Sequence, residues 1–230
     1  MRITQHKHET EYLKGYLSTV EPDFVNLVEF ETTTLDLNSK WGAVGEGNAT
    51  CGDDWDTLIY DKTKWLKLDD EVGCLYEGRS FAMARFVCKN TNLTVRVVGA
   101  HFPQTLTDRN AYDMAITVLR SKINHGERLI FLADTNTEGP EAAASFPSHH
   151  GWNRTNAQLL EDLLGEKENP IAAPLFSGCC QNDGYQWQGD RVMTNFGTVN
   201  TSSILFNDPP SWANCTGSEF HKGVSLVIDV

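Results

Sequence analysis

The segment LIFLADTNTEG, residues 129 to 139, constrains the fold more than any other part of the sequence. Its first half is apolar and typical of a buried strand, but it ends abruptly at Asp134 and Asn136, before a Glu-Gly-Pro turn. Two other apolar segments end similarly: LVEFE places Glu29 at its end, and VVGAHF places His101 there. Any one polar strand end is explained by the need of a strand to reach water. Three together predict a ligand site at the rim of a sheet, where α/β folds bind ligands.

Hydrophobic periodicity predicts the remaining elements. Three helices are expected where apolar residues recur at helical spacing, over 12–20, about 108–124 and 156–164, with Pro22, Gly126 and Gly165 at their ends. Strands are expected over 23–31, 80–88, 94–102, 190–196 and 223–230, and a hairpin over 55–68 with its turn at 61–63. No repeat or long linker interrupts this order, so we expect a single domain over residues 1–230, built from sheets packed together and covered by helices.

The composition limits the possible partners. The formal net charge of -12 argues against passive adhesion to anionic polymers or anionic membranes. A nucleic-acid enzyme stays compatible with it, because a bound divalent cation can reverse the local field. No apolar run approaches the roughly 20 residues that a membrane span needs, so we expect no stable membrane insertion.

Cysteines and sequons bear on the compartment. The six cysteines contain no C-x-x-C pair and allow up to three disulfides in many connectivities: Cys51, Cys74, Cys88, Cys179, Cys180 and Cys215. N-x-S/T sequons begin at Asn48, Asn92, Asn153, Asn200 and Asn214. Together they favour a secreted glycoprotein. The N-terminus lacks an apolar signal core, so either the protein is intracellular or the chain begins downstream of its natural start.

The Asp-x-Asn pair suggests a chemistry. In an extended chain, residues i and i+2 face the same side, so Asp134 and Asn136 would address one substrate group. A carboxylate orients an attacking water, and a carboxamide donates hydrogen bonds to a developing oxyanion without adding negative charge. That combination suits attack on a phosphorus centre.

An ordered set of short motifs resembles a known family. VEFE, GRSFAMARF, VVGAHFP, FLADTN, GDRV and SEFHKGVSLVI together resemble the endonuclease/exonuclease/phosphatase superfamily, the deoxyribonuclease I-like proteins, from about Asp23 to Val230. The resemblance implies an α/β fold (α+β in some schemes), a four-layer sandwich of two packed mixed β-sheets flanked by helices. It also implies a metal-dependent phosphoester hydrolase.

The resemblance implies roles at the metal and the phosphate. Glu29 corresponds to the acid that binds the catalytic cation, and oxygen ligands suit Mg²⁺ or Mn²⁺ better than zinc. Arg79 corresponds to a phosphate-contacting arginine, although an ordinary turn arginine explains it too. His101 corresponds to a histidine that stabilises or protonates the leaving oxygen. Asp134 and Asn136 correspond to the pair that positions the attacking water and the phosphate.

The same resemblance assigns a second histidine. His221 corresponds to the final catalytic histidine, an acid/base group or transition-state stabiliser, and Asp190 to the carboxylate that orients it. Asp54 or Glu77 corresponds to an acidic partner of His101. Two further features have less weight. The GDDWD segment (52–56) could bind a structural Ca²⁺ but suits a solvated loop better, and His149-His150 suit loop residues better than metal ligands.

Two departures from the family pattern matter. Phe220 stands where the family has an aspartate before the last histidine, so metal affinity should fall unless Glu219 or another acid substitutes. The family's first strand, which carries an active-site asparagine, has no counterpart here, which suggests an N-terminally truncated form.

Three functions therefore remain open. The leading one is a monomeric, metal-dependent phosphodiesterase with nucleic acid as its substrate. A phospholipid-directed phosphodiesterase, similar to a sphingomyelinase, would need exposed aromatic loops such as those around Trp187 or Trp212, which suit ordinary packing as well. The third is a catalytically degenerate binding module, which Phe220 favours.

Overall fold

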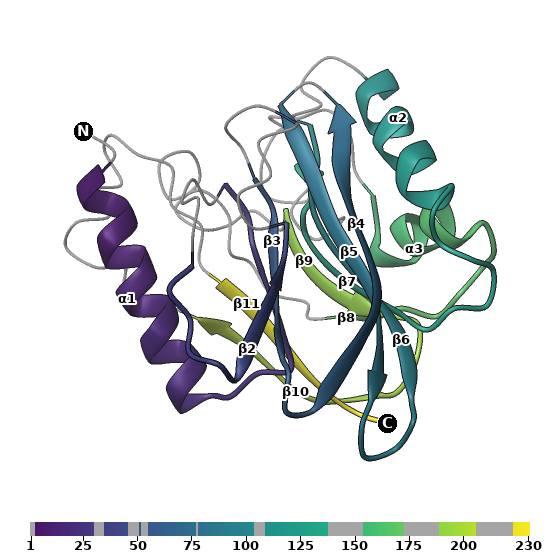
Figure 1. Ribbon diagram of the computed structural model, residues 1–230. Coiled ribbons are helices and arrows are strands. Elements are labelled where there is room, and N and C mark those ends of the chain that lie inside the picture. The colour runs from purple at the N-terminus through teal and green to yellow at the C-terminus, as the bar shows by residue number, and fades with distance from the viewer. Residues whose placement is uncertain are drawn as a thin grey trace.

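The computed structural model describes residues 3–29, 35–45, 51, 55–76, 78–103, 109–137, 154–172, 189–205 and 223–230 (Figure 1). Three helices lie among these residues: α1 (Ile3–Thr19), α2 (Arg109–Arg120) and α3 (Asn156–Leu164). The strands are β1 (Phe24–Leu27), β2 (Trp41–Val44), β3 (Thr57–Asp61), β4 (Trp65–Tyr76), β5 (Arg79–Cys88), β6 (Thr94–His101), β7 (Leu129–Asp134), β8 (Ile171–Ala172), β9 (Asp190–Thr194), β10 (Thr198–Leu205) and β11 (Gly223–Asp229).

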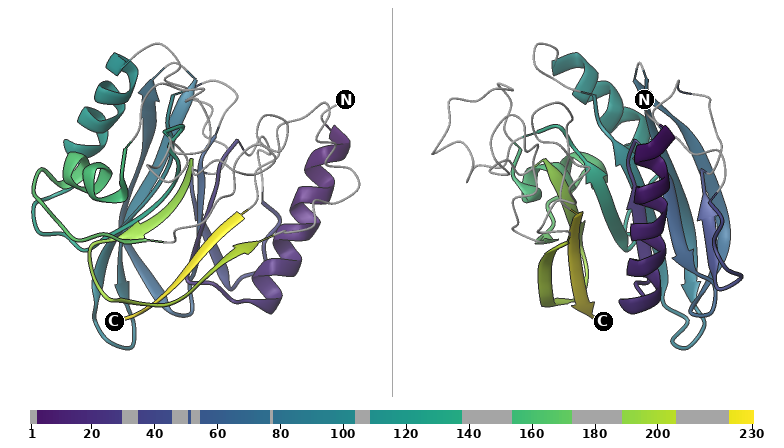
Figure 2. Two further views of the ribbon diagram at one scale, coloured as in Figure 1. Left: turned by 180° about the vertical axis from the view of Figure 1, so that it is seen from behind. Right: turned by 90° about the vertical axis from the view of Figure 1, so that its left-hand side faces the viewer.

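The strands form three sheets. The largest has the order β4-β5-β6-β7-β9-β8, in which β6 and β7 are parallel and the other pairs are antiparallel. A three-stranded antiparallel sheet has the order β1-β3-β2, and β10 pairs with β11. The β10–β11 pair packs against β9 and continues the layer of the three-stranded sheet (Figures 1 and 2). Two sheet layers therefore face each other.

Hydrophobic contacts on three levels hold the layers together. Outside the six-stranded sheet, α2 and α3 bury Tyr112 and Leu160 against Phe131 of β7. Between the sheets, residues such as Leu58 of β3 pack with Phe86 of β5. On the far side of the three-stranded sheet, Leu13 and Leu17 of α1 pack on Trp41 and Ile59. The expected α/β four-layer sandwich of packed sheets flanked by helices is confirmed (Figure 2).

The parallel pair β6–β7 determines where the polar strand ends meet. Helix α2 connects the two strands, so both run in the same direction and end at the same edge of the sheet. Their last residues, His101 and Asp134, are register partners. This edge is called the rim below.

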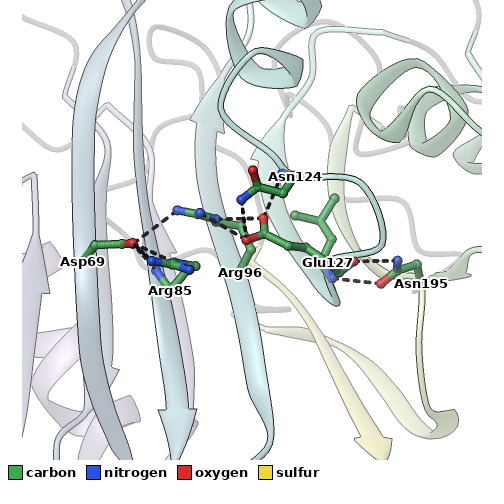
Figure 3. Close-up of polar contacts among 7 residues, drawn as sticks. Asp69, Arg85, Arg96, Asn124, Glu127 and Asn195 are labelled. Atoms are coloured by element: carbon green, nitrogen blue, oxygen red, sulfur yellow. Dashed lines mark hydrogen bonds and ion pairs between the residues drawn. The ribbon is translucent and has the colours of Figure 1, made fainter.

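Charged residues lie at the opposite ends of these strands. The buried guanidinium of Arg96, near the start of β6, donates to Asp69 of β4 at 3.3 Å and to Glu127 before β7 at 3.2 Å (Figure 3). Asp69 also accepts from Arg85 Nε of β5 at 2.6 Å, and Asn195 donates to the Glu127 carbonyl at 3.0 Å. These bonds join β4, β5, β6 and the approach to β7, away from the rim.

Two expectations about local structure are wrong. Residues 55–68 do not form a hairpin, because β3 lies in the three-stranded sheet and β4 in the six-stranded one, so the chain crosses between layers at the turn. The strand expected over 23–31 ends at Leu27 and is half-buried. Glu29 has φ 56°, in the left-handed region, which an extended strand cannot include.

One disulfide lies among the described residues, between Cys51 and Cys74, and Cys88 is a free thiol. Of the up to three disulfides that six cysteines allow, one is therefore present within the described residues, and Cys88 takes no part in it. Cys179, Cys180 and Cys215 lie outside the described residues.

Within the described part of the chain, no helix has the length and apolar character to cross a bilayer.

Candidate active site

The centre of the rim is formed by the last residues of two neighbouring strands. His101 ends β6 and Asp134 ends β7, and both side chains are almost completely buried. His101 Nε2 lies 3.7 Å from Asp134 Oδ2. An imidazole and a carboxylate at this separation are close enough to act on one small substrate group.

Two more predicted residues join this pair. Arg79, the first residue of β5, places Nη1 2.8 Å from each ring nitrogen of His101. The same Nη1 donates to Glu29 Oε1 at 3.1 Å, and His101 Nδ1 lies 3.7 Å from that oxygen. Glu29 follows β1, in the other sheet layer. The rim therefore brings together a glutamate, an arginine, a histidine and an aspartate from both sheet layers.

Asn136 is oriented differently from the sequence-based expectation. Its backbone has φ 46°, so residues 134–136 form a turn rather than an extended chain. Its side-chain Nδ2 donates to the carbonyl of Phe102 at 2.8 Å, and its backbone N–H donates to Asp134 Oδ1 at 3.0 Å. The idea that Asp134 and Asn136 project side by side from a strand is therefore wrong. Asn136 instead ties the end of β7 to the chain that follows His101.

A residue that the sequence analysis missed holds this turn. Arg191 of β9 is 3% exposed and donates to Thr135 Oγ1 at 3.2 Å, to the Thr137 carbonyl at 3.1 Å and to Asn156 Oδ1 at 2.8 Å. Its neighbour Asp190 is the register partner of Asp134. A charged residue inside the strand segment DRVMT was the available signal.

Asp56, which precedes β3, is a second missed residue. It belongs to the GDDWD segment but is 3% exposed, so the solvated-loop interpretation is wrong for this residue. Its carboxylate accepts from Asn26 Nδ2 at 3.0 Å and from Ser80 Oγ at 2.9 Å. Burial raises its pKa to about 7, and the nearby Asp134 carboxylate adds to the rise, against hydrogen bonds that lower it.

Several predicted residues lie outside the described part of the chain. They are Asp54, Glu77, His149, His150, Trp187, Trp212, Glu219, Phe220 and His221. The orienting role of Asp190 toward His221, and the ligand set around Phe220, therefore stay predictions.

Comparisons with solved structures match nearly the whole chain. An endonuclease/exonuclease/phosphatase from Bacteroides vulgatus superposes with a TM-score of 0.69 over 97% of this chain and 91% of that one, at 14% identity. D. rerio TDP2 complexed with single-strand DNA product superposes with a TM-score of 0.67 over 100% of this chain and 94% of that one, at 12% identity. A mannosyl-6-phosphatase of Bacteroides thetaiotaomicron gives a TM-score of 0.63 over 97% and 92% of the two chains, at 11% identity.

The chain has the deoxyribonuclease I-like fold of the endonuclease/exonuclease/phosphatase proteins. No protein-family model matches its sequence, and no curated protein matches it. At these identities the comparison extends to the fold alone, so the assignment of site residues depends on the geometry at the rim.

The rim of this deoxyribonuclease I-like fold offers oxygen donors suited to a hard cation. Carboxylates of Glu29 and Asp134 and the side-chain oxygen of Asn136 are the donor types that Mg²⁺ and Mn²⁺ prefer. Among the residues described, no group of three or more His, Cys, Asp or Glu side chains is arranged to hold a metal ion. The role of Glu29 as a ligand of a divalent cation therefore stays a prediction.

Proposed function

We propose that this chain is a metal-dependent phosphoester hydrolase, a phosphodiesterase that acts on nucleic acid. The observation that carries the proposal is the meeting of Glu29, Arg79, His101 and Asp134 at one rim, within 3.7 Å of one another in successive pairs. This set combines a carboxylate for a cation, a guanidinium for an anionic substrate and an imidazole–carboxylate pair for proton transfer. The likeness in fold to nucleases and phosphatases supports it.

Each side chain has a distinct task in this proposal. Arg79 binds the phosphoryl oxygens, because a guanidinium offers paired N–H donors in the geometry of a phosphate. Asp134 orients the attacking water, and His101 stabilises or protonates the leaving oxygen. Asn136 fixes the turn between them. A divalent cation, held through Glu29, would supply positive charge to the developing phosphoryl oxyanion. His221, with Asp190, would serve as the second acid/base group.

Nucleic acid is the substrate that we propose, although the fold does not fix it. Support comes from the similarity to TDP2, which has been seen with a single-strand DNA product. The net charge of -12 makes such binding dependent on the cation, because the substrate is an anion too. We infer also that the protein works in an oxidising, extracellular compartment, where a Cys51–Cys74 bond persists.

Hydrolysis of bis(p-nitrophenyl) phosphate with magnesium, with and without a chelator, tests the proposal. We expect turnover that the chelator abolishes and that His101→Gln and Asp134→Asn each reduce by about a hundredfold or more. Asp70→Asn is the matched control, since Asp70 is an exposed residue of β4 paired with Lys67. Absence of turnover by the folded, oxidised protein would instead identify a binding module.

The substrate class is tested by comparing two reactions. Plasmid nicking is expected to exceed headgroup release from sphingomyelin vesicles at equal enzyme concentration. The opposite order would identify a phospholipid-directed enzyme and refute the nuclease assignment.

A further inference from the structure

Asp56 forms a buried hydrogen-bonded centre directly beneath the rim. It immediately precedes β3 of the three-stranded sheet, and its carboxylate is within reach of both sheet layers. Ser80 Oγ of β5 donates to Oδ2 at 2.9 Å and in turn accepts the Asp56 backbone N–H at 2.9 Å. Asn26 Nδ2 of β1 donates to Oδ1 at 3.0 Å. The backbone N–H of His101 donates to the same carboxylate.

Each partner of Asp56 is adjacent to a residue of the proposed site. Ser80 follows Arg79, and His101 belongs to the site itself. Asn26 precedes Glu29 by three residues. It also donates to the carbonyl of Leu132, at 3.0 Å, two residues before Asp134. Asp56 and its partners therefore connect all four strand ends from which the site side chains project.

The packing leaves little freedom to this centre. The amide of Asn26 lies directly over Gly99 of β6, where a β-carbon would overlap its atoms. Asn26 Oδ1 is buried without a hydrogen-bond partner among the described residues. An unsatisfied buried acceptor lowers stability, and such local costs are typical of functional sites. The two hydrogen bonds that Asn26 Nδ2 donates therefore keep the side chain in this position, although its oxygen is unsatisfied.

The chemistry of the centre requires an acid. An ionised carboxylate has enough lone pairs to accept from Ser80, Asn26 and the His101 backbone together. An amide has a single acceptor oxygen and would turn N–H groups toward other donors. Yet a buried carboxylate near Asp134 is unfavourable by desolvation and by repulsion, as its raised pKa reflects. The Asp56 carboxylate therefore lowers stability but fixes the position of its partners, so its loss should disturb the site.

We propose that Asp56 is a positioning residue of the active site, which holds the His101 backbone directly and Arg79 through Ser80. The inference rests on the proposed hydrolytic function. Asp56 touches neither substrate nor attacking water in this account. It acts because a shift of about 1 Å in a reacting group can cost about a hundredfold in rate.

Steady-state kinetics separate this role from simple packing. We expect Asp56→Ala to lower kcat about a hundredfold and Asp56→Asn to lower it less, with KM changed by under about threefold. Ser80→Ala leaves the Asp56 carboxylate in place and removes one hydrogen-bond donor, so it should lower kcat about tenfold. This variant provides the test if Asp56→Ala does not fold. Asp70→Asn and Ser121→Ala are matched surface controls, because Asp70 pairs with Lys67 and the Ser121 hydroxyl donates to the carbonyl of Val118 at the end of α2.

A second readout does not depend on turnover. With ¹⁵N-histidine labelling, the backbone amide of His101 is the one of seven histidine signals that disappears in His101→Gln. Weakening or loss of its hydrogen bond to the Asp56 carboxyl group in Asp56→Asn or Asp56→Ala should move the amide proton upfield. In the surface controls the signal should stay in place.

The outcomes distinguish the two proposals. If the wild type hydrolyses the substrate, kcat is the deciding measurement. Values of kcat in the Asp56 and Ser80 variants within twofold of the wild type would overturn the positioning role and leave the hydrolytic function intact. If the wild type does not turn over, the His101 signal decides. A shifted signal then keeps the positioning contact although the proposed function fails, and an unshifted signal overturns both.

Discussion

Arg191 shows how a single buried residue organises the turn at the rim. Its guanidinium bonds to Thr135, Thr137 and Asn156, and so holds the turn that contains Asn136 in its left-handed backbone conformation. A left-handed non-glycine residue persists only where its surroundings determine it. The hydrogen bonds of Arg191 therefore stabilise the backbone geometry of Asp134 and Asn136.

Replacement of Arg191 by lysine should damage the site more than the fold. Arg191→Lys keeps the charge but loses the planar set of donors, so kcat should fall about tenfold and the free energy of unfolding by about 1–3 kcal/mol. Enzyme kinetics and urea unfolding measure the two effects. Arg85→Lys is the control, since Arg85 pairs with Asp69 far from the rim. Equal kcat for wild type and Arg191→Lys would contradict the role of Arg191 in holding the turn at residues 134–137.

The pH dependence of stability should reveal Asp56. Below about pH 4 both the folded and unfolded states carry the proton. The unfolded carboxyl ionises near its ordinary pKa of 3.8, while the folded one, raised to about 7 by burial, keeps its proton. The free energy of unfolding therefore falls as pH rises from about 4 to about 7, by on the order of 4 kcal/mol, and is flat above.

Asp56→Asn lacks this titration. Urea unfolding across that pH window should show the wild type losing stability relative to the variant as pH rises. A constant difference between the two proteins would contradict the raised pKa.

At the scale of elements, the sequence predicts periodic and capped segments well. The helix over 156–164 has the predicted bounds, because Thr155 forms a capping box and Gly165 ends it with φ 80°. The strands that contain His101 and Asp134 are also confirmed, since their apolar runs end sharply. These elements are predicted correctly because their ends are determined by residues close in sequence.

Other elements depend on distant contacts. The turn at 62–64 suits a hairpin locally, yet β3 and β4 separate because each is completed by strands far away in sequence. The polar strand β10, TVNTSSIL, has no apolar alternation and is a strand because it pairs with β11. Asp56 and Arg191 were missed for the same reason, since their partners come from β1, β5, β6, α3 and the turn after β7.

The charged network of Figure 3 should contribute stability and not activity. Arg96→Met removes the cation between Asp69 and Glu127. Leaving these two acids without it should lower the free energy of unfolding by about 2–3 kcal/mol. Because Arg96 lies at the ends of β6 and β7 opposite the rim, kcat should stay within twofold of the wild type. A larger loss of kcat in a folded variant would contradict this separation of roles.

At the scale of the whole molecule, the site depends on both sheet layers staying in register. Glu29 and Asp56 come from the three-stranded layer, and Arg79, His101 and Asp134 from the six-stranded one. The disulfide between Cys51 and Cys74 links the segment before β3 to β4, and so joins the layers covalently near Asp56.

Loss of that disulfide should affect stability and activity together. The bond closes a loop with a sequence separation of 23. Cys51→Ser with Cys74→Ser should lower the free energy of unfolding by about 3 kcal/mol. It should also lower kcat, because the segment that contains Asp56 loses its anchor. Cys88→Ser, at a free thiol, is the control. An unchanged kcat in the double variant would show that the sheets alone hold the site.

Whether the rim residues act as one site is tested most directly by combining His101→Gln with Asp134→Asn in the magnesium-dependent hydrolysis of bis(p-nitrophenyl) phosphate. Residues that serve one reaction step lose activity together, so the double variant should be no slower than the slower single variant, within about threefold. Losses that multiply, or single variants as active as the wild type, would contradict a shared catalytic site.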